Sequence, residues 1–199
     1  MDQQSHIRMF DKQAKKYERM QRKDPTRRFR RKIIPYASGS ILEVAIGTGL
    51  NLPHYQNVTE LVGIDFSPEM LKGARKMADY SPFPVNLKQA DVETIEFEAG
   101  SFDTVVSTLS FCSYNNPVDL LNRFQKWCKP NGQILLMEHG VSSVKTIAWL
   151  QKQVDPLAFR LIGCHQDRDI QGYLAESNLK CEKVERALAG ALYYIWAKP

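Results

Sequence analysis

A glycine turn and two carboxylates have the types and the spacing expected of a nucleoside-binding site. Apolar residues 41–46 lead directly into the Gly-Thr-Gly turn of residues 47–49. This pattern is typical of a buried strand followed by a turn whose backbone approaches a ligand closely. Asp65 and Asp91 end the next two strand-like runs. A carboxylate after the second strand can accept both hydroxyl protons of a ribose, and one after the third can bind the exocyclic amine of adenine.

The same turn is a poor match to a dinucleotide-binding loop. Ala45 stands where a first glycine is usual, and no glycine follows Gly49 at the spacing of GxGxxG. This disfavours a pyrophosphate ligand, and 199 residues leave little room for the substrate domain of an NAD-dependent oxidoreductase. The turn remains suited to a ligand that carries adenosine without phosphate.

Strands and helices must alternate to bring these residues together at one edge of a sheet. The patterning predicts strands at 40–46, 60–65, 85–90, 102–109, 133–138, 179–187 and 191–197, and helices at 5–22, 26–37 (broken near Pro35), 53–57, 67–79, 117–128, 143–162 and 167–177, with a turn at 129–132. This order predicts an α/β fold, a doubly wound and mostly parallel seven-stranded sheet whose ligands lie beyond the carboxyl ends of the strands. We expect one domain over 1–199, made of an N-terminal cap (1–38), a cofactor-binding half (39–139) and a substrate-side segment (140–199).

The positive charge is concentrated in the N-terminal arm. Residues 1–32 contain twelve of the 27 basic residues and four of the 22 acidic ones, which gives +8 there and −3 elsewhere. Such an arm is most often a solvated face, but basic helices also bind anionic membrane surfaces. We therefore expect possible peripheral membrane contact through the basic helices. No nucleic-acid partner is expected, because basic and aromatic residues are not interleaved.

Composition argues against a membrane-spanning, secreted, metal-binding or disulfide-rich protein. No apolar run approaches eighteen residues, so no membrane-spanning helix is expected, and the polar start does not match a signal peptide. The four cysteines form no CxxC pair, so neither a metal site nor a disulfide framework is indicated, and Cys164 beside His165 lacks further ligands at a suitable spacing. A cytoplasmic protein is expected, with a location peripheral to the membrane as the alternative.

Five motifs in order resemble the class I S-adenosylmethionine-dependent methyltransferases: ILEVAIGTG, LVGIDFSPEML, QADVE, FDTVVSTLSF and KPNGQILLMEHG. The resemblance implies a Rossmann-like sheet with an antiparallel last strand, a methyltransferase activity, and S-adenosylmethionine as cofactor with S-adenosylhomocysteine as product. Phe10 to Glu18 also resembles the cap helix of quinone-biosynthesis methyltransferases, whose tyrosine, here Tyr17, closes over the cofactor. The cofactor contacts implied are Tyr17, Glu43, Ala45, Ile46, Gly47, Thr48, Gly49, Asn51, Leu52, Asp65, Phe66, Ser67, Met70, Asp91, Val92, Glu93, Ser107 and Leu109.

The resemblances differ on the acceptor. GTGLNLPHY and IDFSPEML are similar to bacterial phospholipid N-methyltransferases, and STLSFCSY, MEHG and GCH to mammalian alkyl-thiol methyltransferases. Phe111, Cys112, His139 and His165 are the expected substrate-pocket residues, with His139 and Tyr17 as candidates for acid–base assistance.

Apolar side chains in the substrate-side segment favour a small lipophilic acceptor. Trp149, Leu150, Phe159, Leu161 and Ile162 predict an apolar pocket. The non-enzymatic alternative is a sensor or assembly factor that binds S-adenosylmethionine without catalysis. The acceptor atom and the oligomeric state stay open.

Overall fold

The computed structural model describes residues 3–21 and 23–199. Its helices are α1 (Gln3–Met20), α2 (Arg27–Ile33), α3 (Pro68–Ala78), α4 (Pro117–Trp127), α5 (Lys145–Ile162) and α6 (Ile170–Glu176), with short 3₁₀ turns η1 (Ile34–Tyr36), η2 (Leu52–His54) and η3 (Phe111–Ser113). Its strands are β1 (Ser38–Val44), β2 (Asn57–Asp65), β3 (Val85–Gln89), β4 (Phe102–Thr108), β5 (Cys128–His139), β6 (Lys180–Ala187) and β7 (Leu192–Lys198).

These strands form a single sheet in the order β3-β2-β1-β4-β5-β7-β6. The first five strands in chain order pair in parallel, and β7 runs antiparallel to both β5 and β6. The chain reverses its direction of winding between β1 and β4, so the carboxyl ends of these two strands flank a topological switch point, where such sheets bind ligands. The predicted doubly wound sheet with an antiparallel last strand is confirmed.

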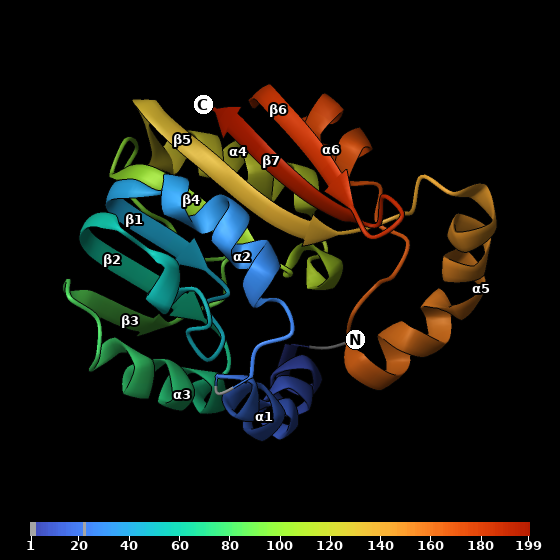
Figure 1. Ribbon diagram of the computed structural model, residues 1–199, viewed down its shortest axis with the longest axis horizontal. Coiled ribbons are helices and arrows are strands. Elements are labelled where there is room, and N and C mark those ends of the chain that lie inside the picture. Colours follow the sequence, from blue (N-terminus) through green and yellow to red (C-terminus); the bar gives the residue numbers. More distant parts are fainter. Residues whose placement is uncertain (1–2, 22) are drawn as a thin grey trace.

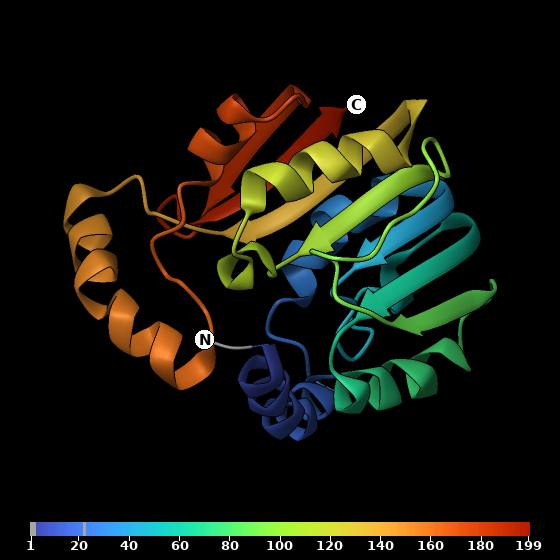
Figure 2. The same cartoon turned by 180° about the vertical axis from the view of Figure 1, so that it is seen from behind.

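Helices cover both faces of the sheet (Figures 1 and 2). On one face, Ile33 of α2 and Leu71 of α3 pack against β1, β2 and β5. On the other, Phe124 and Trp127 of α4 and Leu174 of α6 pack against β4, β5 and β7. Burial of a side chain of this size removes its apolar surface from water, which stabilises the fold by about 1.5–3 kcal/mol. The two cores therefore fix the strand ends that carry the site.

Two helices lie outside these layers. The helix α1 packs along α3 below the carboxyl ends of the strands, while α5 stands apart from the sheet and returns toward α1 at its C-terminal end (Figure 1). The apolar stripe predicted on the first helix is present, with Ala14 buried and Tyr17 half-buried. The helix was expected at 5–22, and residue 22 lies outside the described residues.

Among the differences from the expected boundaries, two change the type of an element. The short helix predicted at 53–57 is the 3₁₀ turn Leu52–His54, in which Pro53 occupies an early helical position that suits its fixed φ. The turn predicted at 129–132 lies within the bounds of β5. There Cys128 pairs with Phe102 and Gln133 with Thr104, so residues 129–132 loop out of the ladder as a bulge.

Candidate active site

The turn after β1 exposes backbone toward the switch point. Gly47 and Gly49 adopt left-handed conformations, with φ of 58° and 81°. A Cβ on Gly47 would have no neighbour nearer than the Ala45 carbonyl oxygen at 3.9 Å, so the space beside Gly47 is open. A Cβ on Gly49 would instead lie 2.9 Å from Leu52 Cδ1. Gly47 thus leaves room for a ligand, and Gly49 is required for packing.

Ala45 carries strain at the same turn. Its φ is 48°, a left-handed conformation that costs an L-residue about 1–2 kcal/mol and glycine almost nothing. This explains why a glycine is usual here. Leu109, at the end of β4, has a φ of 55°, so two adjacent strands leave the sheet through strained residues at the switch point, as occurs at functional sites.

Asp65 lies at the centre of the site. Its two carboxylate oxygens accept hydrogen bonds from the backbone N–H groups of Gly47 and Ser67, each at 2.9 Å. Burial raises the pKa of Asp65 to about 6, although both of these hydrogen bonds lower it. The carboxylate joins the glycine turn to the start of α3, and its remaining lone pairs can accept ligand hydroxyl groups.

Glu43 belongs to a buried network rather than to an open surface. Its oxygens accept hydrogen bonds from Asn51 Nδ2 at 2.9 Å and from the Tyr55 hydroxyl at 2.7 Å. Burial raises the pKa of Glu43 to about 7, against the effect of these partners and of Arg30. Arg30 Nη1 donates to Asn51 Oδ1 at 2.7 Å and to Thr108 Oγ1 at 3.0 Å. The network therefore connects α2 to the ends of β1 and β4.

A hollow opens beyond the end of β3. It is lined by His6, Phe66, Asp91, Glu93, Ser113, Tyr114, Asn115 and Phe159. Asp91 Oδ1 accepts the backbone N–H of Glu93 at 2.9 Å. The Glu93 carboxylate accepts two backbone N–H groups, from Asn115 and Asn116, and so fixes the loop after η3. Phe66 contacts Phe10 edge to face, with ring centroids 5.3 Å apart, so the cap forms part of the wall.

The cap helix α1 bridges both sides of the site. Asp11 Oδ1 accepts a hydrogen bond from Ser67 Oγ at 2.5 Å, and Gln21 Nε2 donates to the Thr48 carbonyl oxygen at 2.7 Å. Burial, followed by the nearby sulfurs of Cys112 and Cys164, raises the pKa of the Tyr17 hydroxyl. Tyr17 therefore lies between the glycine turn and the ends of β4 and β5.

The ends of β4 and β5 are joined by a buried carboxylate. Glu138 accepts hydrogen bonds from Ser107 Oγ at 2.6 Å and from the backbone N–H groups of Ser110 and Phe111 at 2.7 and 3.1 Å. Burial raises its pKa. Ser107 and Phe111 thus face the interior. Glu138 holds η3 in place, and the next residue of β5, His139, lies beside it.

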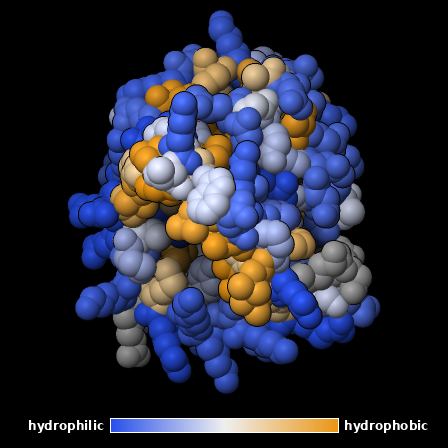
Figure 3. All heavy atoms as spheres, turned by 90° about the vertical axis from the view of Figure 1, so that its right-hand side faces the viewer, coloured by the Kyte–Doolittle hydropathy of each residue, from blue (hydrophilic) through white to orange (hydrophobic). Residues whose placement is uncertain are grey.

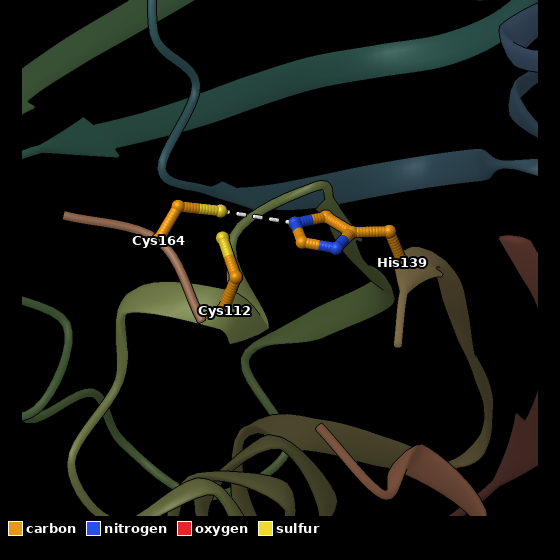
Figure 4. A group of neighbouring side chains, drawn as sticks. All are labelled: Cys112, His139 and Cys164. Atoms are coloured by element: carbon orange, nitrogen blue, oxygen red, sulfur yellow. Dashed lines mark hydrogen bonds between the residues drawn. The ribbon is translucent and has the colours of Figure 1, made fainter. Parts of the chain in front are cut away.

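Three of the residues around this strand end converge (Figure 4). His139 Nε2 lies 3.0 Å from Cys164 Sγ, and Cys112 completes the group. The neighbouring thiol of Cys112 and the ring of His139 lower the pKa of Cys164 to about 5. Burial lowers the pKa of His139, but the contact with Cys164 outweighs it and the net shift is upward. The two shifts have opposite directions, which favours a thiolate on Cys164 beside a protonated His139 ring.

The remaining predicted residues take other places. His165 Nδ1 lies 2.8 Å from Asp155 Oδ2, and its ring stacks on Phe159 at 4.0 Å, so it fixes the loop after α5. The side chains of Ile46, Leu52, Met70 and Val92 are buried beside the site.

The structure corrects the prediction that Trp149, Leu150, Phe159, Leu161 and Ile162 form an apolar pocket. Trp149 and Leu161 are 64% and 65% exposed, and Leu150 and Ile162 are exposed as well. Only Phe159 of that group lines the hollow beyond β3, whereas Trp149 and Leu150 line a separate, open hollow with Lys145 and Thr146. Helical spacing alone does not reveal which face of α5 packs on the domain, and here the apolar face points to solvent.

Sequence reasoning missed three contributors to the site. Arg30 resembled the other charges of the basic arm, yet it is only 6% exposed and paired with Asp24. Glu138 gave no local signal, because its partner Ser107 lies 31 residues away along the chain. Cys164 was considered only with its neighbour His165, whereas its partner His139 lies 25 residues away.

Comparisons with known proteins agree with this geometry. The methyltransferase domain family matches residues 42–136. A phosphatidylethanolamine N-methyltransferase of Cereibacter sphaeroides is 30% identical over 78% of this chain and 77% of that protein. A thiol S-methyltransferase of Homo sapiens is 29% identical over 79% of this chain and 68% of that protein. An S-adenosylmethionine-dependent methyltransferase structure from Mesorhizobium loti shares the fold, with a TM-score of 0.69 at 14% identity over 90% of this chain and all of that one.

The residues of the site fit S-adenosylmethionine. Thr48 Oγ1 is buried and has no hydrogen-bond partner among the described residues, so it is available to a polar group of a ligand. The open space beside Gly47 and the spare lone pairs of Asp65 lie at the same turn. Asp65 would bind the ribose, Asp91 and Phe66 would surround the adenine, and Thr48 would meet the amino-acid end.

Proposed function

The chain belongs to the S-adenosylmethionine-dependent methyltransferase family, and we propose that it transfers the methyl group to a small lipophilic nucleophile by in-line displacement. S-Adenosylmethionine supplies the methyl as an activated sulfonium. The task left to the protein is to align the acceptor and exclude water, and such positioning can contribute about 7–11 kcal/mol in good cases. Tyr17, whose hydroxyl keeps its proton because its pKa is raised, is suited to orient the acceptor, and His139 is suited to take up the acceptor's proton where it has one.

The apolar face of α5 carries the proposal for a lipophilic acceptor. Trp149, Leu157 and Leu161 are 60% or more exposed along this helix, and Figure 3 shows apolar side chains gathered on this side of the molecule. The helix ends at Gly163, and the next residue, Cys164, lies against His139. An acceptor that adsorbs on α5 therefore has a short path to the ends of β4 and β5.

Two acceptor classes fit this arrangement. A phospholipid headgroup amine is favoured by the exposed face of α5 together with the basic residues of α1, since apolar burial and cationic charge together bind an anionic membrane surface. No helix among the described residues is long and apolar enough to cross a membrane. A thiol is favoured by the sulfur and imidazole groups at the strand ends, which can receive its proton.

Methyl transfer from labelled S-adenosylmethionine to a panel of acceptors tests the proposal. The panel holds phosphatidylethanolamine vesicles, an alkyl thiol, a demethylated quinone and a polar amine. We expect transfer to at least one lipophilic acceptor, and Trp149→Ser with Leu161→Ser to raise its KM while the KM for S-adenosylmethionine stays unchanged. Tyr80→Ser, which removes an 87% exposed aromatic ring after α3, is the matched control. Transfer only to the polar amine, or the same KM change in Tyr80→Ser, would contradict the lipophilic-acceptor proposal.

A further inference from the structure

Three soft donor groups from separate parts of the chain meet at the carboxyl ends of β4 and β5. We propose that Cys112, His139 and Cys164 bind one Zn²⁺ ion. The two sulfurs and a ring nitrogen all lie within 4.8 Å of one another. Figure 4 shows the two sulfurs side by side and the imidazole directed at them. The inference goes beyond the proposed function, which needs no metal ion; with Zn²⁺ bound, His139 and the two sulfurs would serve as ligands and no longer as acceptors of the proton.

The spacing suits a tetrahedral ion. Zinc binds thiolate sulfur at about 2.3 Å and imidazole nitrogen at about 2.0–2.1 Å, which places two sulfurs about 3.8 Å apart and sulfur and nitrogen about 3.6 Å apart. The observed contact of 3.0 Å between His139 Nε2 and Cys164 Sγ and the 4.8 Å limit for the group bracket these values.

The backbone around each donor is already fixed. The N–H of Leu109 donates to the Met137 carbonyl oxygen at 2.8 Å, and Glu138 fixes the first residues of η3, so Cys112 and His139 are held in register. A preorganised set of this kind loses little conformational freedom when an ion binds.

The loop that carries Cys164 is tied to the same place. The N–H of His165 donates to the Cys112 carbonyl oxygen at 2.9 Å. Asp155 accepts hydrogen bonds from the His165 ring and from the N–H of Gln166, which attaches the loop to α5. Two separate contacts thus position Cys164 beside the other donors.

The donor set and its location indicate the class of ion. Two thiolates and an imidazole select zinc over magnesium or calcium, which prefer oxygen ligands. Three protein donors leave a fourth tetrahedral position for water or for an acceptor atom, the arrangement of catalytic rather than structural zinc sites. Cys112 is only 4% exposed, which limits competition from bulk solvent at that sulfur.

Cobalt substitution provides a readout that is independent of catalysis. The fully reduced protein is stripped with a chelator and titrated with Co²⁺, and a thiolate-to-cobalt charge-transfer band should grow to one ion per chain and disappear when Zn²⁺ is added. Cys164→Ser and His139→Gln should each weaken the apparent affinity by more than the roughly 10–100-fold that loss of an outer-shell partner costs. Unchanged thermal unfolding of the metal-free variants would confirm that they fold.

The exposed thiol Cys181 on β6 supplies the matched control, since Cys181→Ser removes a cysteine far from the group. We expect this variant to bind Co²⁺ as the parent protein does. The inference is overturned if the reduced protein shows no band while all four thiols react with a thiol reagent. A band that forms in Cys164→Ser with the affinity of the parent protein, or that is lost in Cys181→Ser, would overturn it equally.

Discussion

Protonation of Asp65 should weaken the binding of S-adenosylmethionine below neutral pH. The carboxylate can accept both ribose hydroxyl groups only when it is ionised, because a protonated carboxyl group uses one oxygen as a donor. Burial raises its pKa to about 6 in the free protein. From that value, about ten in eleven molecules are ionised at pH 7 and about one in eleven at pH 5, which corresponds to a tenfold loss of affinity, or about 1.4 kcal/mol. Affinity should therefore be greatest above pH 7 and fall as the pH drops through 6.

Isothermal titration at several pH values measures this loss directly. The same titrations in buffers of different ionisation enthalpy should show the release of about half a proton per bound ligand near pH 6, because binding selects the ionised carboxylate. Asp65→Asn keeps the shape of the side chain and removes its titration. This variant should bind more weakly at every pH and show no dependence between pH 5 and 7.

A second variant separates the effect of Asp65 from that of its buried neighbour. Burial raises the pKa of Glu43 to about 7, so this group also titrates in the measured range. Glu43→Gln keeps an oxygen that can accept the hydrogen bond from Asn51, and it removes the titration of this side chain. The fall in affinity below pH 6 should remain in this variant. An affinity that is flat from pH 5 to 7 in the parent protein, or the same tenfold loss in Asp65→Asn, would refute the role assigned to Asp65.

Three further results should follow from the structure. Ala45→Gly should raise the free energy of unfolding by about 0.5–1 kcal/mol in denaturant titrations, because the strain of the left-handed conformation at Ala45 exceeds the entropy cost of glycine. A loss of stability would contradict this strain. Arg30→Met should destabilise the protein by about 3–5 kcal/mol, since it leaves buried Asp24 without its partner, whereas exposed Arg31→Met should change stability by less than about 0.5 kcal/mol; equal effects would contradict the network. Amide hydrogen exchange should be faster in α1 than in α2 and should slow in α1 when S-adenosylhomocysteine binds; a protected α1 in the free protein would contradict the idea that it opens.

The features that follow local rules could be predicted from the sequence. The end of β2 at Asp65, the end of β3 two residues before Asp91 and the glycine turn after β1 depend on short apolar runs and on the conformational freedom of glycine, so periodicity located them. The N-terminus of α3 was found because Ser67 and Pro68 form a cap signal, and Ser67 Oγ does accept the N–H of Met70.

Features that depend on contacts distant in the chain could not be predicted in this way. Cys112 and Cys164 meet only because β4 and β5 are neighbours and the loop after α5 folds back against η3, which no spacing rule describes. The outward apolar face of α5 was misread as a pocket because periodicity gives an apolar stripe but not the surface it contacts. Arg30 was misread for the converse reason, since a cation in a basic arm gives no sign that it is buried.

The cap therefore consists of two helices with different physical roles. Ile33 and Arg30 of α2 are buried, and they connect this helix to the core and to the network around Glu43. The helix α1 has a single fully buried side chain among its described residues, Ala14, and it is bound to α3 mostly by polar contacts such as the ion pair of Glu18 with Lys76. Exposed ion pairs contribute about 0–1 kcal/mol each, and segments with few buried contacts open locally at low cost. Opening of α1 about a fixed α2 would uncover Asp65 and carry Tyr17 away from it while the sheet and the strained turns stay intact, so cofactor exchange does not require the fold itself to move.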